Sequence, residues 1–171
     1  IEKTQIFLQV PDKKQEYYSI FMALITGQIL DYIGSRSYDK DRGDKRILVA
    51  LDEFASLGHL DILGPFRKFR KNGGNLCVLT QSLADIELIY SQKERQAILD
   101  NAKYTVILNS NDPSTRKEFS ELVGYHTVLS VSRSKSASGT STSTSEKDEY
   151  IIKPTEWKTM DEDLIVVHAA G

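Results

Sequence analysis

Two adjacent carboxylates, Asp52 and Glu53, stand directly after the apolar run Ile47–Leu51. An unbroken apolar run of this length predicts a strand covered on both faces, as in a parallel sheet. The acids would then lie at the carboxyl end of the strand, where open α/β sheets bind ligands. One carboxylate there can help to hold Mg²⁺, often through water, and the other can orient or deprotonate an attacking water. This is the layout of a Walker B segment, although the same acids could instead cap the next helix.

Gln81 stands at the end of the next predicted strand, Leu76–Thr80. The carboxyl ends of neighbouring parallel strands meet at one edge of a sheet, so Gln81 is expected beside Asp52 and Glu53. Its amide can hydrogen-bond a γ-phosphate or the attacking water, and it can report the nucleotide state to the following helix. The alternative is a glutamine that caps the helix starting at Ser82, or one that only meets solvent.

Arg67 and Arg70 lie near the end of a predicted helix that stops before Asn72-Gly73-Gly74. An arginine presented to the phosphate of a neighbouring subunit stabilises transition-state charge. Cations at a helix end also complement the helix dipole without any further role. A third use of the same cluster is contact with DNA phosphates.

Some motifs are absent from the sequence. It contains no Gly-x-x-x-x-Gly-Lys-Ser/Thr, whose backbone nest and lysine hold the phosphates in P-loop enzymes, so the chain alone is not expected to bind ATP tightly. Its three histidines and single cysteine lack the spacing of a metal site. No Ser-His-Asp arrangement is suggested, and there is no Gly-x-Ser-x-Gly.

The composition is that of a globular domain, with 171 residues, 27% charged and 40% hydrophobic. The net charge of −2 means that any nucleic-acid contact must come from a local basic patch. No stretch approaches the roughly 20 apolar residues of a membrane helix. Because the chain opens at Ile1 rather than Met, we expect it to be a piece of a longer protein.

Strand-like and helix-like segments alternate along most of the chain. The patterns predict strands at Thr4–Val10, Ile47–Leu51, Leu76–Thr80, Tyr104–Leu108 and Leu164–Val167, and helices at Lys14–Ile33, Leu60–Lys71, Leu83–Ile98 (broken near Tyr90), Pro113–Val123 and Pro154–Met160. This alternation predicts an α/β fold whose mainly parallel sheet has helices on both faces. Residues 125–153 are predicted to leave it as a hairpin, with arms at Val128–Val131 and Tyr150–Ile152 and a mobile Ser/Thr-rich loop at Ser132–Ser145.

Several segments resemble the TraG/TraD-type coupling proteins of conjugation and type IV secretion. They are Leu51–Gly58, Leu79–Ile86, Ile98–Ala102, Asn111–Pro113, Leu122–Gly124, the Ser-rich excursion and Ile151–Glu156. The first two segments in tandem are fairly specific, and the resemblance runs from about residue 4 to 171. It implies a partial RecA-like three-layer fold, with residues 1–171 as the carboxyl-terminal part of the motor domain.

The resemblance also implies a function. Members are membrane-anchored, hexameric ATPases that bring relaxosome proteins, the relaxase and DNA to a type IV secretion channel, at the cytoplasmic face of the inner membrane. It makes Asp52 and Glu53 the Walker B pair, with Asp52 on Mg²⁺ through water, Gln81 the nucleotide sensor, and Arg70 or Arg67 the arginine finger. The family's Walker A motif and membrane helices precede the part of the motor that this chain resembles. ATP and Mg²⁺ are therefore expected in the parent protein, and neither in the isolated fragment.

Two other functions fit the sequence, as does an α/β domain that has no role in nucleotide binding. The first is a non-catalytic module that recognises relaxosome or accessory proteins. The second is the motor fragment of another RecA-like DNA translocase. The Phe-Ala-Ser-Leu-Gly continuation after Asp52-Glu53 favours the coupling family over the second.

Overall fold

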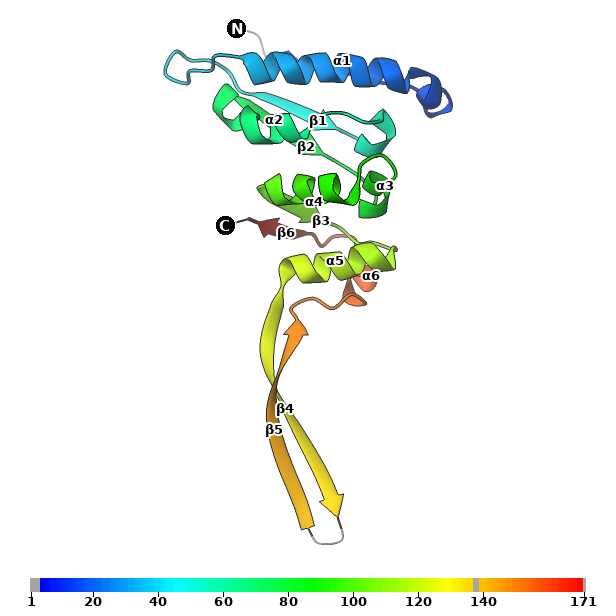
Figure 1. The fold of residues 1–171 in the computed structure, drawn as a ribbon, viewed down its shortest axis with the longest axis vertical. Coiled ribbons are helices and arrows are strands. Elements are labelled where there is room, and N and C mark those ends of the chain that lie inside the picture. Colours follow the sequence, from blue (N-terminus) through cyan, green and yellow to red (C-terminus); the bar gives the residue numbers. More distant parts are fainter. Residues whose placement is uncertain (1–3, 137–138, 171) are drawn as a thin grey trace. The chain divides into compact units, whose positions relative to one another are not determined.

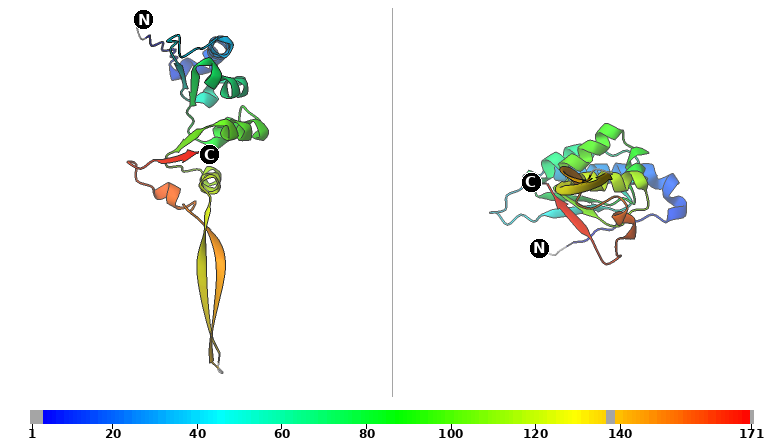
Figure 2. Two further views of the ribbon diagram at one scale, coloured as in Figure 1. Left: turned by 90° about the vertical axis from the view of Figure 1, so that its left-hand side faces the viewer. Right: turned by 90° about the horizontal axis from the view of Figure 1, so that it is seen from below.

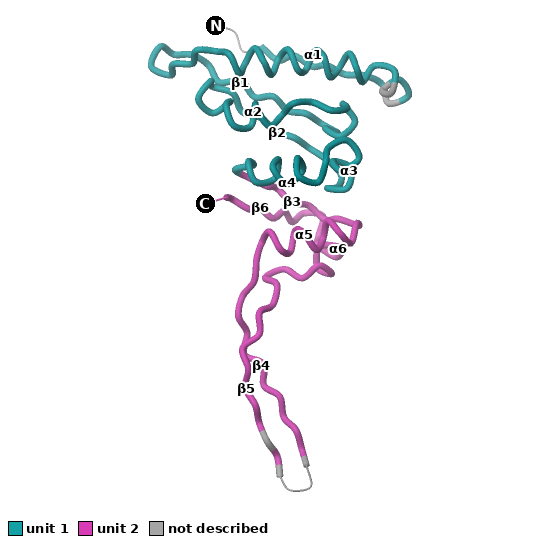
Figure 3. The backbone as a smooth tube through the Cα atoms, viewed as in Figure 1, with its two compact units in different colours: residues 1–103 teal, residues 104–171 magenta. Residues whose placement is uncertain are grey.

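The computed structural model describes residues 4–136 and 139–170. The chain divides into two compact units, residues 1–103 and 104–171, coloured separately in Figure 3. Figure 1 labels the helices and strands of each unit.

The first unit alternates helices with two strands. Its elements are η1 (Asp12–Lys14), α1 (Gln15–Ser35), β1 (Ile47–Leu51), η2 (Phe54–Leu57), α2 (Leu63–Lys68), η3 (Phe69–Asn72), β2 (Gly74–Val78), α3 (Leu83–Glu87) and α4 (Gln92–Asn101). The predicted strand Thr4–Val10 is wrong, because these residues have no regular structure and no described strand pairs with them. An extended segment becomes a stable strand only when a neighbour satisfies its backbone groups, and its alternating side chains do not supply that neighbour.

The two strands of this unit are parallel, as predicted. Their register runs from Ile47 opposite Gly74 to Leu51 opposite Val78. Burial alternates along β1, however, and the Leu48 side chain is 67% exposed while Leu51 is buried. The apolar run therefore has one covered side within this chain, where the sequence predicted cover on both.

Ile33 of α1 and Phe69 of η3, which are both buried, pack against the start of β2 at Gly74. Gly74 allows this approach, since a Cβ at that position would lie 2.7 Å from both side chains. The preceding Gly73 has φ +74°, and its N–H donates to the carbonyl of Phe69 to close η3. The glycine pair thus ends the short helix and brings α1 against the strand.

The predicted break near Tyr90 separates α3 from α4. Ser82 caps α3 by accepting from the N–H of Asp85, and Ser91 starts α4 in a capping box with Glu94. Two caps only nine residues apart stop one helix and begin the next, because each satisfies N–H groups that a continuous helix would use itself.

The second unit contains a small antiparallel pair and a long hairpin. Its elements are β3 (Tyr104–Ile107), α5 (Pro113–Val123), β4 (Tyr125–Ser136), β5 (Gly139–Tyr150), α6 (Glu156–Thr159) and β6 (Val166–Ala169). Strand β6 pairs antiparallel to β3. Asp112 caps α5 by accepting from the N–H of Thr115 at 2.7 Å, and Pro113 occupies the first turn, as the sequence predicted.

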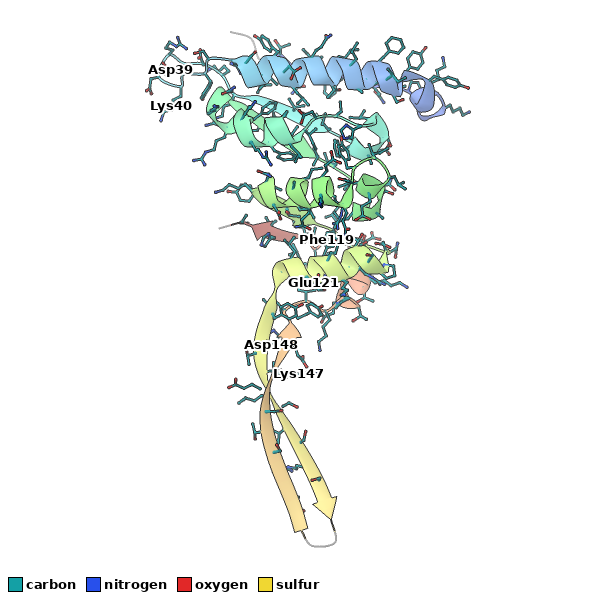
Figure 4. All side chains as sticks on the ribbon, in the orientation of Figure 1. Asp39, Lys40, Phe119, Glu121, Lys147 and Asp148 are labelled. Carbon is teal, nitrogen blue, oxygen red and sulfur yellow. The ribbon has the colours of Figure 1, made fainter. Side chains whose placement is uncertain are left out.

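Trp157 of α6 forms the centre of this unit's core, with no exposed surface. Its Nε1–H donates to the hydroxyl of Ser120 at 2.9 Å, and the Phe119 ring meets it edge-on at 5.7 Å between centroids. Figure 4 labels Phe119 and Glu121 on α5. Helix α5 is therefore tied to the segment that comes after the hairpin.

The hairpin is longer and more regular than predicted. Strands β4 and β5 pair without interruption from Tyr125 opposite Tyr150 to Ser136 opposite Gly139. Most of the expected mobile loop, Ser132–Ser145, is therefore strand. Composition alone misleads here, because backbone pairing does not require apolar side chains and threonine favours extended backbone. Figures 1 and 2 show the two strands twisting around each other.

Candidate nucleotide site

The Asp52–Glu53 pair follows β1 at an abrupt turn. The N–H of Glu53 donates to Oδ1 of Asp52 at 3.0 Å, and both side chains are exposed. Glu53 has φ +45° and ψ +47°, and it is the single non-glycine residue with positive φ in the described part of the chain. Left-handed backbone costs a residue with a Cβ roughly 1–2 kcal/mol, and such strain concentrates at functional sites.

Leu79 connects the acids to the segment that carries Gln81. Its N–H donates to the carbonyl of Leu51, and its carbonyl accepts from the N–H of Phe54, both at 2.9 Å. The chain after β2 therefore runs beside the Asp52–Glu53 turn. Gln81 follows two residues later, at the same end of the parallel pair, with its side chain exposed. The cap of α3 is Ser82, so Gln81 is not used to cap it.

A buried aromatic cluster holds the segment after Glu53, and sequence analysis missed it. Phe54 is fully buried and stacks on Tyr90 at 5.2 Å between ring centroids. The Tyr90 hydroxyl accepts from the N–H of Leu60 at 2.9 Å and donates to the carbonyl of Leu60 at 3.1 Å. Burial raises the pKa of Tyr90 to about 12. The predicted helix break near Tyr90 was the signal in the sequence for this cluster, because it leaves an aromatic side chain in the short connection before the cap of α4.

His59 extends the same cluster. Its ring lies 4.8 Å from that of Tyr90, and its Nε2 is 3.3 Å from Oε1 of Glu94. The backbone N–H and hydroxyl of Ser91 hold the pKa of Glu94 below its usual value, and His59 adds to this effect. The segment between η2 and α2 is thus fastened to the start of α4, the second of the two helices after Gln81.

Arg67 and Arg70 lie at the other end of the parallel pair. Arg67 is in α2 and Arg70 in η3, directly before the amino end of β2, and both side chains are exposed. The acids follow the carboxyl end of β1, one five-residue strand away, which is about 16 Å. The structure therefore brings Asp52, Glu53 and Gln81 to one end and does not bring either arginine to them.

The described residues contain no group of three or more His, Cys, Asp and Glu side chains arranged to hold a metal ion. Within the described residues, no helix has the length and apolar character needed to cross a membrane.

A cavity of about 540 Å³ lies in the first unit, between α1 and the segment Leu57–Asp61. Ile20, Leu24 and Asp31 line it from the helix. Asp52, Glu53 and Gln81 are not among its lining residues. The side chains of these three candidate residues are exposed.

Similarity to known proteins covers the whole chain. Residues 1–171 match the family described as type IV secretory system conjugative DNA transfer. The type IV secretion system-coupling protein VirD4 of Bartonella henselae (strain Houston 1) is 26% identical over 149 residues, which are 86% of this chain and 23% of that protein. VirD4 of Bartonella quintana (strain Toulouse) is 26% identical over 134 residues, 78% of this chain and 20% of that protein. The chain thus spans less than a quarter of the length of either relative.

Solved structures of the bacterial conjugative coupling protein TrwB share the fold. The unbound form superposes with a TM-score of 0.79 at 22% identity, over 95% of this chain and 37% of TrwB. The complex of TrwB with ADP and Mg²⁺ gives 0.77 at 21% identity, over 95% of this chain and 36% of TrwB. The fold is accordingly the RecA-like α/β fold that the sequence predicted. Since the family match extends over every residue, the chain belongs to the type IV secretory system conjugative DNA transfer family.

Proposed function

We propose that the chain is the carboxyl-terminal part of the motor domain of a coupling protein, and that its Asp52–Glu53 turn and Gln81 form one wall of an ATP site. The bridge made by the Leu79 backbone carries this proposal, because it holds the two candidate segments together at one end of the parallel pair. Open α/β sheets bind ligands at the carboxyl ends of their strands. The nucleotide and Mg²⁺ named for TrwB complexes support the choice of ligand.

Each residue has a separate role in this proposal. Asp52 holds Mg²⁺ through water, and the ion neutralises phosphate charge when it is bound. Glu53 orients the attacking water or takes its proton, and Gln81 hydrogen-bonds the γ-phosphate or that water. The backbone of Glu53 is left-handed and that of Asp52 is not, and this difference between adjacent acids supports a division of labour.

The arginines fit an action between subunits. Arg67 and Arg70 precede the amino end of β2, whereas the acids of the same chain follow the carboxyl end of β1, at the other end of the strand pair. In a ring of parent subunits, a homo-hexamer in our proposal, one of them would serve the nucleotide site of the neighbour as an arginine finger.

We propose that the parent protein recruits the relaxosome, including its relaxase, and drives DNA or protein into a type IV secretion channel. It would act at the cytoplasmic face of the inner membrane, anchored by helices outside this chain. The roles of VirD4 as a secretion-system coupling protein and of TrwB as a conjugative coupling protein support this assignment.

The direct test is Glu53→Gln in the full-length parent. We expect ATP hydrolysis to be abolished and nucleotide binding to remain, because the amide keeps the shape of the side chain and loses the base. Glu162→Gln, at an exposed position of the second unit, is the matched control and should hydrolyse normally. Normal turnover in Glu53→Gln would remove Glu53 from the mechanism. The 171-residue chain alone should show no ATPase activity, and turnover sensitive to Glu53→Gln would show that it holds a complete site.

Mixed rings test the arginines. Parent carrying Glu53→Gln and parent carrying Arg70→Ala should each be inactive, whereas a random equal mixture should recover about a quarter of the wild-type rate if the arginine acts on the neighbour's nucleotide. No recovery, with both variants inactive, would place the arginine's action within its own subunit. The same experiment with Arg67→Ala decides between the two residues.

A further inference from the structure

The β4–β5 hairpin has two chemically different faces. Neighbouring side chains on a strand point to opposite faces, and directly paired residues of two antiparallel strands share a face. The register therefore assigns each paired residue in the outer half of the hairpin to one of its two faces. One face carries serines, with Ser130 opposite Ser145 and Ser132 opposite Ser143. The other carries Val131, Arg133 and Lys135 opposite three threonines, Thr144, Thr142 and Thr140.

The second face, which we call the basic threonine face, is defined by Arg133, Lys135, Thr140, Thr142 and Thr144. All five side chains are exposed. It alternates two cations on one strand with three hydroxyl groups on the other. Guanidinium, ammonium and hydroxyl groups are among the side-chain groups that proteins use to contact phosphate oxygens.

Charge is segregated along the hairpin. Residues 130–145 contain Arg133 and Lys135 and no acidic residue, whereas Glu146–Glu149 carries three acids and one lysine. Glu146 and Asp148, on the face of the cations, lie four and six residues from Thr142 along β5, about 14 and 20 Å away. These separations exceed the screening length of about 10 Å at 0.1 M salt, so the outer half behaves as a positive surface. Figure 4 labels Lys147 and Asp148 near the base of the hairpin.

The shape restricts the ligand further. Each strand has 12 residues, so the hairpin extends about 40 Å. Its outer half carries mainly small side chains, and no aromatic residue except His126 occurs in residues 126–149. Binding of single strands usually depends on aromatic side chains on which bases stack. A duplex has its bases already stacked, and its major groove admits a two-stranded β-ribbon.

We propose that the basic threonine face is a binding site for the phosphate backbone of duplex DNA, and that this binding does not depend on base sequence. Arg133 and Lys135 pair with phosphates, and the hydroxyls of Thr140, Thr142 and Thr144 donate to phosphate oxygens along the groove. This site rests on the proposed function only for the presence of DNA, since nothing in it requires nucleotide. In a ring of parent subunits, several such hairpins would add their weak individual affinities.

The test is an NMR titration of the 171-residue chain with a short duplex of about 12 base pairs at about 100 to 200 mM salt. Amide shifts should concentrate in residues 130–145. Two neutralised phosphates contribute about 1.8 to the slope of log K against log salt, so Arg133→Ala/Lys135→Ala should reduce the slope by about that amount and weaken binding at about 100 mM salt at least about ten-fold.

The control is Lys147→Ala/Lys153→Ala, which removes the same charge from the base of the hairpin, where both lysines pair with Glu149. It should leave the slope nearly unchanged. Equal losses in the two double variants would show a response to net charge and overturn the site, as would shifts confined to other parts of the chain. The proposed site would also be overturned if a single strand of equal charge bound as tightly as the duplex. A basic threonine face that bound a protein partner and no DNA would overturn it as well. Glu53→Gln should not affect this titration, so failure here is distinct from failure of the nucleotide site.

Discussion

Replacing Tyr90 by phenylalanine removes one hydroxyl from the cluster that anchors the segment after Glu53. The N–H of Leu60 then loses its acceptor in a buried position. The carbonyl of Leu60 keeps a second bond, from the N–H of Ile62 at 2.9 Å, so the loss falls mainly on the N–H group. A buried donor left without a partner costs about 1–3 kcal/mol. We expect Tyr90→Phe to lower the free energy of local unfolding by about 2 kcal/mol.

Amide hydrogen exchange measures this effect at the affected group. A loss of about 2 kcal/mol corresponds to exchange of the Leu60 amide roughly 30 times faster in Tyr90→Phe. Tyr17→Phe, on the 77% exposed Tyr17 side chain, is the control and should leave the Leu60 amide unchanged. Unchanged exchange at Leu60 in Tyr90→Phe would refute the anchoring role that the two hydrogen bonds assign to this hydroxyl.

The raised pKa of Tyr90 also predicts that the stability of the fold decreases at alkaline pH. Burial raises the pKa of Tyr90 to about 12, so the folded state disfavours the tyrosinate form. The stability that this side chain contributes is complete below its unfolded pKa near 10 and is lost as the pH rises from 10 to about 12. The decline approaches about 1.4 kcal/mol per pH unit. The free energy of unfolding, measured by urea at each pH, is compared between the wild type and Tyr90→Phe. Other titrating groups contribute equally to both proteins, so the difference between them isolates the contribution of Tyr90. The same pH dependence in both proteins would contradict the prediction.

Substitutions at three further sites test the backbone and one helix cap. Glu53→Gly should be more stable than Glu53→Ala by about 1 kcal/mol in urea unfolding, because glycine adopts the left-handed conformation without strain; equal stability would argue against strain at this turn. Gly73→Ala should destabilise more than Gly43→Ala, since both glycines have positive φ but only at Gly73 would the new Cβ overlap the Tyr38 ring; equal losses would contradict that packing. The hydrogen bonds from Thr115 hold the pKa of Asp112 below its usual value, so its support of α5 is present near neutral pH and lost as the pH falls through that lowered value; Asp112→Asn should remove this acid dependence of helix content measured by circular dichroism.

Local sequence signals account for much of the fold. The run Ile47–Leu51 is a strand, Asp112 and Pro113 start a helix, and the chain breaks its helix at Tyr90, all as predicted. These features depend on groups a few residues apart, and their caps and turns are satisfied within the same stretch. Segment Thr4–Val10 and the serine-rich arms were misread because strand formation depends on a distant backbone partner, which composition does not reveal.

The order of residues was enough to identify the side chains at the ends of β1 and β2 and the resemblance that led to the family. Three features emerge only from the folded chain: the Leu79 backbone joins the Glu53 turn to the Gln81 segment, Glu53 is left-handed, and Tyr90 anchors the residues after that turn. The difference is one of range. A strand end depends on neighbouring residues, whereas hydrogen bonds between residues about 30 positions apart, such as Leu60 with Tyr90, exist only once the chain has packed.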